Sequence, residues 1–274
     1  MGFAGDRRDP DDELAWFALQ WAQALTSSCT FHYNNEKRTI VPTTPSAFDK
    51  KYAAFLFDMD GTLINSTAAA ERVWARWAEE QGLDVKTFLP TMHGARAVDT
   101  VRRLGLPGVD PETEAIRITD AEILDVEGIV PLPGAAEFLK ALPREKWTIV
   151  TSSPLELAKR RLAAAGIPVP DNLVTAEDVK VGKPNPDCYL LAARKLGVDA
   201  KDCLVFEDAV PGILAGDAAG ADVMVITATH KHPIETAHTT IHDYQDLHTQ
   251  VDPQGRILVR APSEQSMRKG SPIS

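Results

Sequence analysis

The sequence contains few cysteines, and its 274 residues include only Cys29, Cys188 and Cys203. Their odd number and wide spacing fit neither a disulfide framework nor a cysteine metal site, so we expect a reducing, cytoplasmic environment. Positive charge is also scarce, because 39 acidic residues against 29 lysines and arginines leave a formal net charge of −10. This balance argues against nucleic acid or an acidic membrane surface as a partner.

Long hydrophobic runs are absent as well, so the sequence predicts no membrane-spanning helix. The apolar stretch at residues 14–25 is short, is interrupted by Gln20 and Gln23, and follows acidic residues where a signal peptide carries positive charge. We interpret residues 1–47 as an N-terminal extension and linker, containing either an amphipathic helix or no regular structure. The sequence also lacks a Walker lysine loop and a dinucleotide glycine fingerprint, which are the common nucleotide-binding motifs.

Hydrophobic residues nevertheless make up 44% of the chain, and the most informative of them form a short run at residues 53–57. A continuous apolar run of this length is typical of a strand buried on both faces of a parallel sheet. The run stops at Asp58 and Asp60, and Gly61 follows as a turn residue. In open α/β sheets, ligands bind beyond the carboxyl ends of the strands. Two carboxylates this close repel each other, and a cation or a shared proton relieves the repulsion.

Strand-like and helix-like segments alternate through most of the remaining sequence. Further strands are predicted at residues 147–151, 172–175, 203–206 and 222–227, with single helices between them. This order specifies a doubly wound parallel sheet, which places the chain in the α/β fold class. Residues 65–130 differ, because they contain three helical patterns and no convincing strand, so we expect a small all-helical cap inserted after the first strand. A terminal hairpin is predicted at residues 250–259.

Polar side chains also follow two of the later strands: Thr151 and Ser152 after one, Glu207 and Asp208 after the other. Lys183 stands between them in the chain, in the stiff turn Gly-Lys-Pro-Asn-Pro-Asp. Each has an ordinary explanation, since hydroxyls cap helices, acids favour helix N-termini, and turn lysines are commonly solvated. Together, at one edge of one sheet, they supply acids for a divalent cation, a hydroxyl donor and an ammonium group, which is the composition of a phosphate site.

With these motifs the sequence resembles the haloacid dehalogenase-like hydrolases. The four motifs of that family read here as Asp58-Met59-Asp60-Gly61-Thr62, Thr151, Lys183 in its Gly-Lys-Pro turn, and Glu207-Asp208 followed by Pro211-Gly212. Within the family the sequence is most similar to sugar- and polyol-phosphate phosphatases, including glycerol-phosphate and 2-deoxyglucose-6-phosphate phosphatases, through residues 92–96, 127–134 and 175–180. Ser153 is a departure, because these relatives usually carry glycine there.

The resemblance implies both architecture and chemistry. The core would be Rossmann-like, and the chain would divide into an extension at 1–47, a core at 48–64 and 131–250, a cap at 65–130 and a tail at 251–274. Asp58 would be the nucleophile that forms a phosphoaspartate, and Asp60 would serve as acid and then as base. Mg²⁺ would be held by Asp58, Asp208 and the Asp60 backbone carbonyl, with Glu207 close by.

The phosphate would be bound by three further residues: Thr151, Ser152 and Lys183. The rest of the substrate, a small phosphorylated sugar or polyol, would contact the cap at His93, Gly94 and Arg96. Gly94 would let the backbone approach the ligand, and Arg96 can donate several hydrogen bonds. The alternative is that Arg96 is an exposed arginine near a helix start.

Other interpretations remain open. A sugar phosphomutase would share the capped fold and both aspartates, and a catalytically silent regulatory protein would share the scaffold but should lack an essential group. Trp74 and Trp77 are interpreted as the core of the cap rather than as a substrate platform. The five histidines between residues 230 and 248 are not expected to form a metal site. We expect a monomer.

Overall fold

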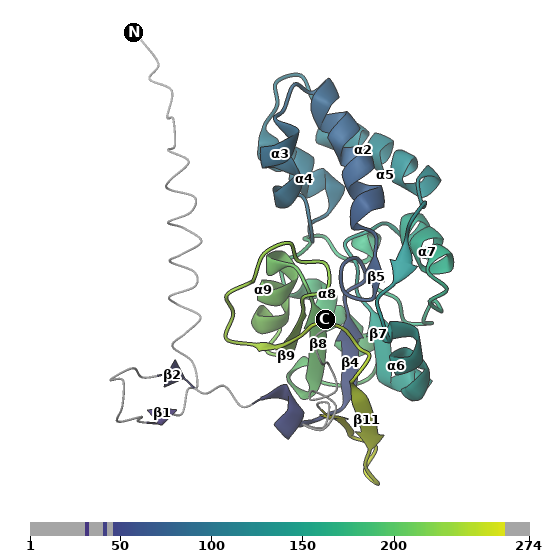
Figure 1. The fold of residues 1–274 in the computed structure, drawn as a ribbon, viewed down its shortest axis with the longest axis vertical. Helices are drawn as coiled ribbons and strands as arrows, with labels where there is room; N and C mark the ends of the chain where they lie inside the picture. The colour runs from purple at the N-terminus through teal and green to yellow at the C-terminus, as the bar shows by residue number, and fades with distance from the viewer. Residues whose placement is uncertain (1–30, 33–40, 43–45, 261–274) are drawn as a thin grey trace, which may run out of the picture. The chain divides into compact units, whose positions relative to one another are not determined.

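The computed structural model describes residues 31–32, 41–42 and 46–260 (Figure 1). The chain divides into two compact units, Met1–Pro45 and Ser46–Ser274. In the first unit the described residues are two short strands, β1 (Phe31–His32) and β2 (Val41–Pro42), which pair antiparallel. The segment at residues 14–25 lies outside the described residues.

A five-stranded parallel sheet forms the centre of the second unit, in the order β10-β9-β8-β4-β7. The five strands are β4 (Ala54–Phe57), β7 (Trp147–Ile149), β8 (Cys203–Glu207), β9 (Asp222–Ile226) and β10 (Thr239–Ile241). The interior strand β4 pairs with β8 on one side and β7 on the other, and its four residues are all buried, as the continuous apolar run predicts. The structure therefore confirms the α/β fold class and the parallel sheet.

Helices cover both faces of the sheet, and the alternation of side chains along β4 separates the two faces. Phe55 and Phe57 pack in a core with α6 (Ala135–Ala141) and α7 (Leu155–Ala164). Ala54 and Leu56 point to the opposite core, with α8 (Asp187–Lys195) and α9 (Val210–Ala218). This arrangement is the double winding that the order of elements predicts.

The cap is helical and has a hydrophobic core of its own. Its helices are α2 (Thr67–Glu80), α3 (Val85–Phe88), α4 (Ala97–Leu104) and α5 (Pro111–Leu124), with the 3-10 helix η2 (Leu89–Thr91). Trp74 and Trp77 are buried in this core, which confirms their interpretation. The short helix α3 was not among the three predicted. The cap joins the core through β5 (Ile64–Asn65) and β6 (Val130–Pro131), which pair antiparallel, and in Figure 1 its helices lie together beyond the end of the sheet.

Two terminal boundaries differ from those expected. The hairpin of β11 (His248–Val251) and β12 (Ile257–Arg260) pairs with β3 (Lys51–Tyr52), and Ile257 and Val259 are buried in the core. A boundary at residue 251 therefore falls inside this hairpin. A boundary at residue 47 falls inside the 3-10 helix η1 (Ala47–Asp49), whose first residue is also buried.

One predicted strand is wrong. Residues 172–175 form no regular strand, and only Val174 makes an isolated bridge, to Val150. The chain turns directly afterwards into η4 (Ala176–Asp178), so no second residue can extend the pairing. Two further 3-10 helices complete the unit: η3 (Arg144–Lys146) and η5 (Ala200–Asp202).

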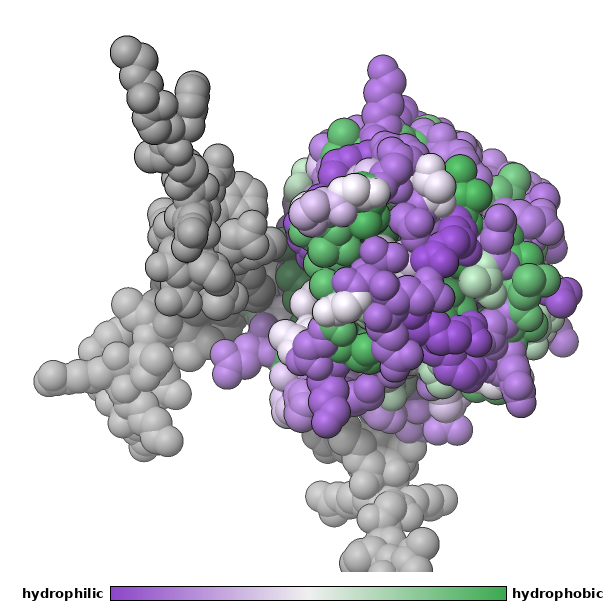
Figure 2. Space-filling view, turned by 90° about the horizontal axis from the view of Figure 1, so that it is seen from above, coloured by the Kyte–Doolittle hydropathy of each residue, from purple (hydrophilic) through white to green (hydrophobic). Residues whose placement is uncertain are grey.

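One face of the molecule is shown in Figure 2 and is mostly polar. Hydrophilic residues dominate the face seen in Figure 2, and hydrophobic residues occupy smaller areas between them. Among the described residues, no helix combines the length and the hydropathy that a bilayer crossing needs.

Candidate active site

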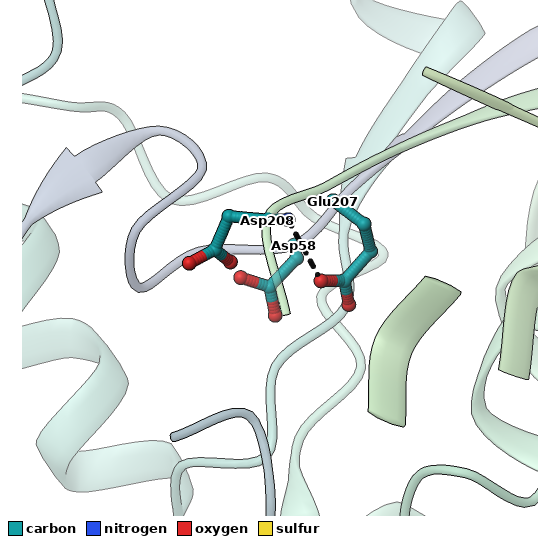
Figure 3. A group of neighbouring side chains, drawn as sticks. All are labelled: Asp58, Glu207 and Asp208. Atoms are coloured by element: carbon teal, nitrogen blue, oxygen red, sulfur yellow. Dashed lines mark hydrogen bonds between the residues drawn. The ribbon is translucent and has the colours of Figure 1, made fainter. Parts of the chain in front are cut away.

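Three carboxylates gather at the carboxyl end of the central strands (Figure 3). Asp58 follows β4, Glu207 ends β8 and Asp208 follows it. Phe57 pairs with Phe206 in the parallel register, so the next residues of the two strands emerge side by side. One carboxylate oxygen from each of the three acids lies within 4.8 Å of the others. Among the described residues this is the one group of three or more such side chains with metal-ligand spacing.

Lys183 joins two of these acids. Its Nζ lies 2.6 Å from Asp58 Oδ1, 2.6 Å from Glu207 Oε1 and 3.2 Å from the Val150 carbonyl oxygen. The turn that holds it is closed by the Asn185 N–H, which donates to the Gly182 carbonyl at 3.1 Å. The ammonium group is therefore buried beside the carboxylates rather than solvated, which was the ordinary explanation for this residue.

Glu207 is fixed from several sides. Tyr189 Oη donates to its Oε1 at 2.8 Å, and the backbone N–H groups of Asp208 and Ala209 donate to its Oε2 at 3.0 and 3.2 Å. A Cβ at Gly212 would lie 1.6 Å from Glu207 Oε1, so only glycine leaves this carboxylate its place. Gly212 therefore makes room for an acid, whereas Gly216 of the same helix packs against Val223 of the sheet.

The charges of this cluster do not balance. Burial and the Glu207 carboxylate raise the pKa of Asp58 to about 7. Burial and the Asp58 carboxylate raise the pKa of Asp208 well above its usual range. Burial lowers the pKa of Lys183, but the two acids beside it outweigh that effect and raise it. Three carboxylates thus share one ammonium, and the excess negative charge and oxygen donors suit a divalent cation.

Asp60 lies just outside this cluster and faces the cavity. Its Oδ1 accepts hydrogen bonds from Ser66 Oγ at 2.5 Å and Arg161 Nη1 at 3.0 Å, and its Oδ2 accepts one from Ser153 Oγ at 3.1 Å. Ser66 occupies the N-cap position of α2, but its hydroxyl makes no cap hydrogen bond and donates to Asp60 instead. Ser153, for which the resemblance predicted a glycine, is one of the three donors.

The two expected hydroxyls after β7 have different partners. Thr151 Oγ1 accepts the Ser153 N–H at 3.0 Å, and within the described part of the chain no acceptor faces its own proton. Ser152 Oγ donates to the Gly94 carbonyl of the cap at 3.0 Å. Thr151 is thus available to a ligand, while Ser152 joins core to cap.

A cavity of about 500 Å³ lies between cap and core. Asp58, Asp60, Thr151 and Asp208 line it on the core side. His93 and Gly94 line it from the cap, as predicted. The segment at residues 229–232, which sequence reasoning missed, also lines it.

This missed segment reaches the cap. Lys231 Nζ lies 3.1 Å from Glu71 Oε1 of α2, and His230 Nε2 lies 2.8 Å from the Asp208 carbonyl oxygen. Burial lowers the pKa of His93, which lies 3.6 Å from Glu71. The one sequence feature that could have predicted a place for this segment at the cavity is the run of polar residues that follows β9.

Arg96 does not line this cavity. Its Nε donates to Asp99 Oδ2 at 2.6 Å, and its Nη1 donates to the carbonyl oxygens of Val179 and Lys180 at 3.3 and 3.2 Å. These contacts turn the guanidinium toward the chain that precedes Lys183, where a Cβ at Gly182 would lie 2.7 Å from Nε. Arg96 instead lines a small second pocket that also includes Thr151 and Lys183, so its contact with substrate stays a prediction. Arg96 is half-buried and is therefore not the exposed arginine of the alternative.

Comparison with known proteins supports one family. The model of the haloacid dehalogenase-like hydrolases matches residues 52–220. Hexitol phosphatase A of Escherichia coli (strain K12) is 38% identical over 211 residues, which cover 75% of this chain and 98% of that protein. Glycerol-1-phosphate phosphohydrolase 1 of Saccharomyces cerevisiae is 34% identical over 202 residues, covering 69% and 80%.

A solved structure agrees with this assignment. A hydrolase from Pseudomonas syringae is similar with a TM-score of 0.59 and 30% sequence identity, over 70% of this chain and 94% of that one. The family model, which matches residues 52–220, and the identity to the curated relatives carry the family assignment. The chain belongs to the haloacid dehalogenase-like hydrolases.

Proposed function

We propose that this hydrolase is a Mg²⁺-dependent phosphatase that acts on small sugar or polyol phosphates. The observation that carries the proposal is the Asp58 carboxylate at the base of the cavity, held by Lys183 and lying beside two further buried acids. The names of its relatives, a hexitol phosphatase and a glycerol-1-phosphate phosphohydrolase, support this substrate class. A cavity of about 500 Å³ suits such a metabolite.

The proposed reaction has two steps. Asp58 attacks the phosphorus, the bond from phosphorus to the alkoxy oxygen breaks, and the Asp60 carboxylic acid gives its proton to the leaving oxygen. A water then attacks the phosphorus of the phosphoaspartate, gives its proton to the Asp60 carboxylate, and releases inorganic phosphate and free Asp58.

The surrounding residues would stabilise the charge of this reaction. Lys183 and the Thr151 hydroxyl would neutralise the non-bridging oxygens of the phosphate. Asp58, Asp208 and the Asp60 carbonyl would hold the Mg²⁺, with Glu207 close by. Bound there, the ion would supply the positive charge that lets a carboxylate approach a phosphate dianion. The cap at residues 65–130 would close the cavity over the substrate, and the parts of the second unit on either side of the cap would form the core that carries the chemistry.

Removal of divalent cations is expected to abolish turnover, because the excess negative charge of the acidic cluster would then repel the phosphate. The measurement is inorganic phosphate released from a hexitol phosphate and from glycerol 1-phosphate, before EDTA, after EDTA, and after excess Mg²⁺. We expect Mg²⁺ to restore the rate and to raise the melting temperature of the metal-free protein. Full turnover by metal-free protein would contradict the cation requirement, and an isomerised sugar phosphate without phosphate release would contradict the phosphatase.

The substitution Gly212→Ala is expected to lower kcat/KM by about 10- to 100-fold, the usual effect of disturbing a group that orients a metal site. The added methyl would displace Glu207 from Lys183 and Tyr189. Gly216→Ala is the matched control, because it adds the same methyl to the same helix but meets Val223 at 2.9 Å. The control should lower the melting temperature and leave kcat nearly unchanged. Equal losses of kcat/KM in both variants would show that packing of α9, and not Glu207, is responsible.

A further inference from the structure

One buried arginine touches both the proposed acid and the cap. Arg161 of α7 is 5% exposed, and so is Glu122 of the cap helix α5. Arg161 Nη1 donates to Asp60 Oδ1 at 3.0 Å, and its Nη2 donates to Glu122 Oε1 at 2.9 Å. The sequence motifs do not include either residue, and the reaction proposed above uses neither.

We propose that Arg161 is a positioning residue that ties the orientation of the Asp60 carboxylate to the placement of the cap. The proposal rests on the role assigned above to Asp60. When the cap lies on the core, Glu122 holds one end of the guanidinium and Asp60 accepts from the other. When the cap moves away, Glu122 leaves with α5, and Arg161 loses the anchor that fixes its direction.

The chemistry of the guanidinium supports this role. Its planar fork presents several donors in a fixed geometry, so one side chain can hold two carboxylates at set positions. A lysine in this place would offer a single ammonium without that geometry. Moving a proton donor by about 1 Å can change a rate by roughly 100-fold, so the placement of Asp60 matters for the rate of reaction.

Burial argues that the arginine has more than a packing role. Removing a charged group from water is costly, and a buried ion pair is often no more stable than an apolar replacement. Arg161 is nevertheless a buried charged side chain, and it lines the wall of the cavity together with Glu122. Within the part of the chain that the structure describes, its Nε has no hydrogen-bond partner, so the side chain is not placed to satisfy all its donors. Its two paired nitrogens instead serve the carboxylates of core and cap.

The other contacts of Asp60 do not provide this link. Ser153 belongs to the core, and Ser66 stands where the cap begins. Arg161 is the donor whose second partner belongs to the cap helix α5. The coupling is therefore expected to depend on the pair Arg161–Glu122 in addition to Asp60.

The test compares Arg161→Met with the wild type on two substrates. A hexitol phosphate has an alkoxide leaving group that needs a proton, whereas p-nitrophenyl phosphate has a leaving group that departs unaided. We expect kcat for the hexitol phosphate to fall about 10- to 100-fold, with KM within about threefold of the wild-type value. The loss of kcat on p-nitrophenyl phosphate should be much smaller. Arg160→Met, an exposed neighbour on the same helix, is the matched control and should leave kcat unchanged on both substrates.

Changes at Glu122 test the cap side of the link. Glu122→Met should give the same selective loss as Arg161→Met, and Glu122→Gln, which keeps an acceptor for Nη2, should recover most of kcat. Combining Arg161→Met with Glu122→Met should add little to either alone. If Arg161→Met does not fold, Glu122→Met and Glu122→Gln decide the matter, because both leave the hydrogen bond from Arg161 to Asp60 possible.

Several results would overturn the coupling: equal losses on both substrates, a change confined to KM, or additive effects of the two methionine substitutions. Asp60→Asn in the same assay separates this failure from a failure of the proposed function. If Asp60→Asn shows no dependence on the leaving group, the role of Asp60 is wrong. If Asp60→Asn does depend on the leaving group, but Arg161→Met lowers kcat equally on both substrates, only the role of Arg161 is wrong.

Discussion

Replacing the proposed nucleophile in Asp58→Asn is expected to lower kcat by roughly 10⁴-fold or more, the scale on which loss of a nucleophile acts in other hydrolases. The amide has nearly the shape of the carboxylate but cannot form the acyl phosphate. The measurement is phosphate release under saturating hexitol phosphate and Mg²⁺. Turnover near that of the wild type in a sample shown by mass spectrometry to contain only asparagine would exclude Asp58 as nucleophile.

The same variant should be folded, and its stability provides the control. Burial and Glu207 raise the pKa of Asp58 to about 7, so ionising Asp58 is unfavourable in the folded protein without a cation. A raised carboxyl pKa means that folded stability falls as the pH rises from about 4, the usual unfolded value, toward 7. In EDTA at pH 8 we therefore expect Asp58→Asn to melt at a higher temperature than the wild type. A lower melting temperature would mean that lost contacts to Lys183, and not lost charge repulsion, dominate the change.

Asp60→Asn is expected to lower kcat by about 100- to 10⁴-fold on a hexitol phosphate, the usual contribution of a general acid or base. The physical reason is that the alkoxide cannot leave without a proton, and the amide does not provide one. The p-nitrophenyl ester needs no such proton, so its kcat should fall less. A remaining loss is expected there, because hydrolysis of the phosphoaspartate still lacks its base.

The ratio of the two losses is the informative quantity for Asp60. It should be compared with the ratio for Thr151→Val, which removes a hydroxyl that would contact the phosphate of either substrate. The Thr151 variant should lower kcat on both substrates by similar factors. If Asp60→Asn does the same, Asp60 acts on the phosphate and not on the leaving group.

Much of the core could be predicted because its signals are local. The apolar run at residues 53–57 stops at acids, and parallel strands bring such ends to one edge, so the grouping of Asp58, Glu207 and Asp208 follows from strand order. The roles of these residues stay predictions. Strand pairing itself is not local, which explains why residues 172–175 look like a strand and make only one bridge.

Side-chain direction was the part that the sequence could not provide. Arg96 begins a cap helix near the cavity, yet Asp99, three residues further on, and two backbone carbonyls turn it away. The sequence contains one indication that Arg161 is buried, because Arg161 shares the buried side of α7 with Leu157 and Leu162. An arginine on an apolar face needs a buried acid as partner, but its identity depends on how α5 packs, which periodicity does not determine.

The position of β4 between β8 and β7 has a consequence for the order of events during synthesis. Both of its neighbours, β7 and β8, are made later, and the whole cap is translated in between. The cap can bury its tryptophans through contacts among its own helices, whereas β4 must wait as an unpaired apolar segment on the nascent chain. Unpaired strands of this kind invite association with other chains, and charges beside them oppose it. Lys50 and Lys51 before β4, and Asp58 and Asp60 after it, are such charges, so the acids proposed for catalysis would also protect the emerging chain from aggregation.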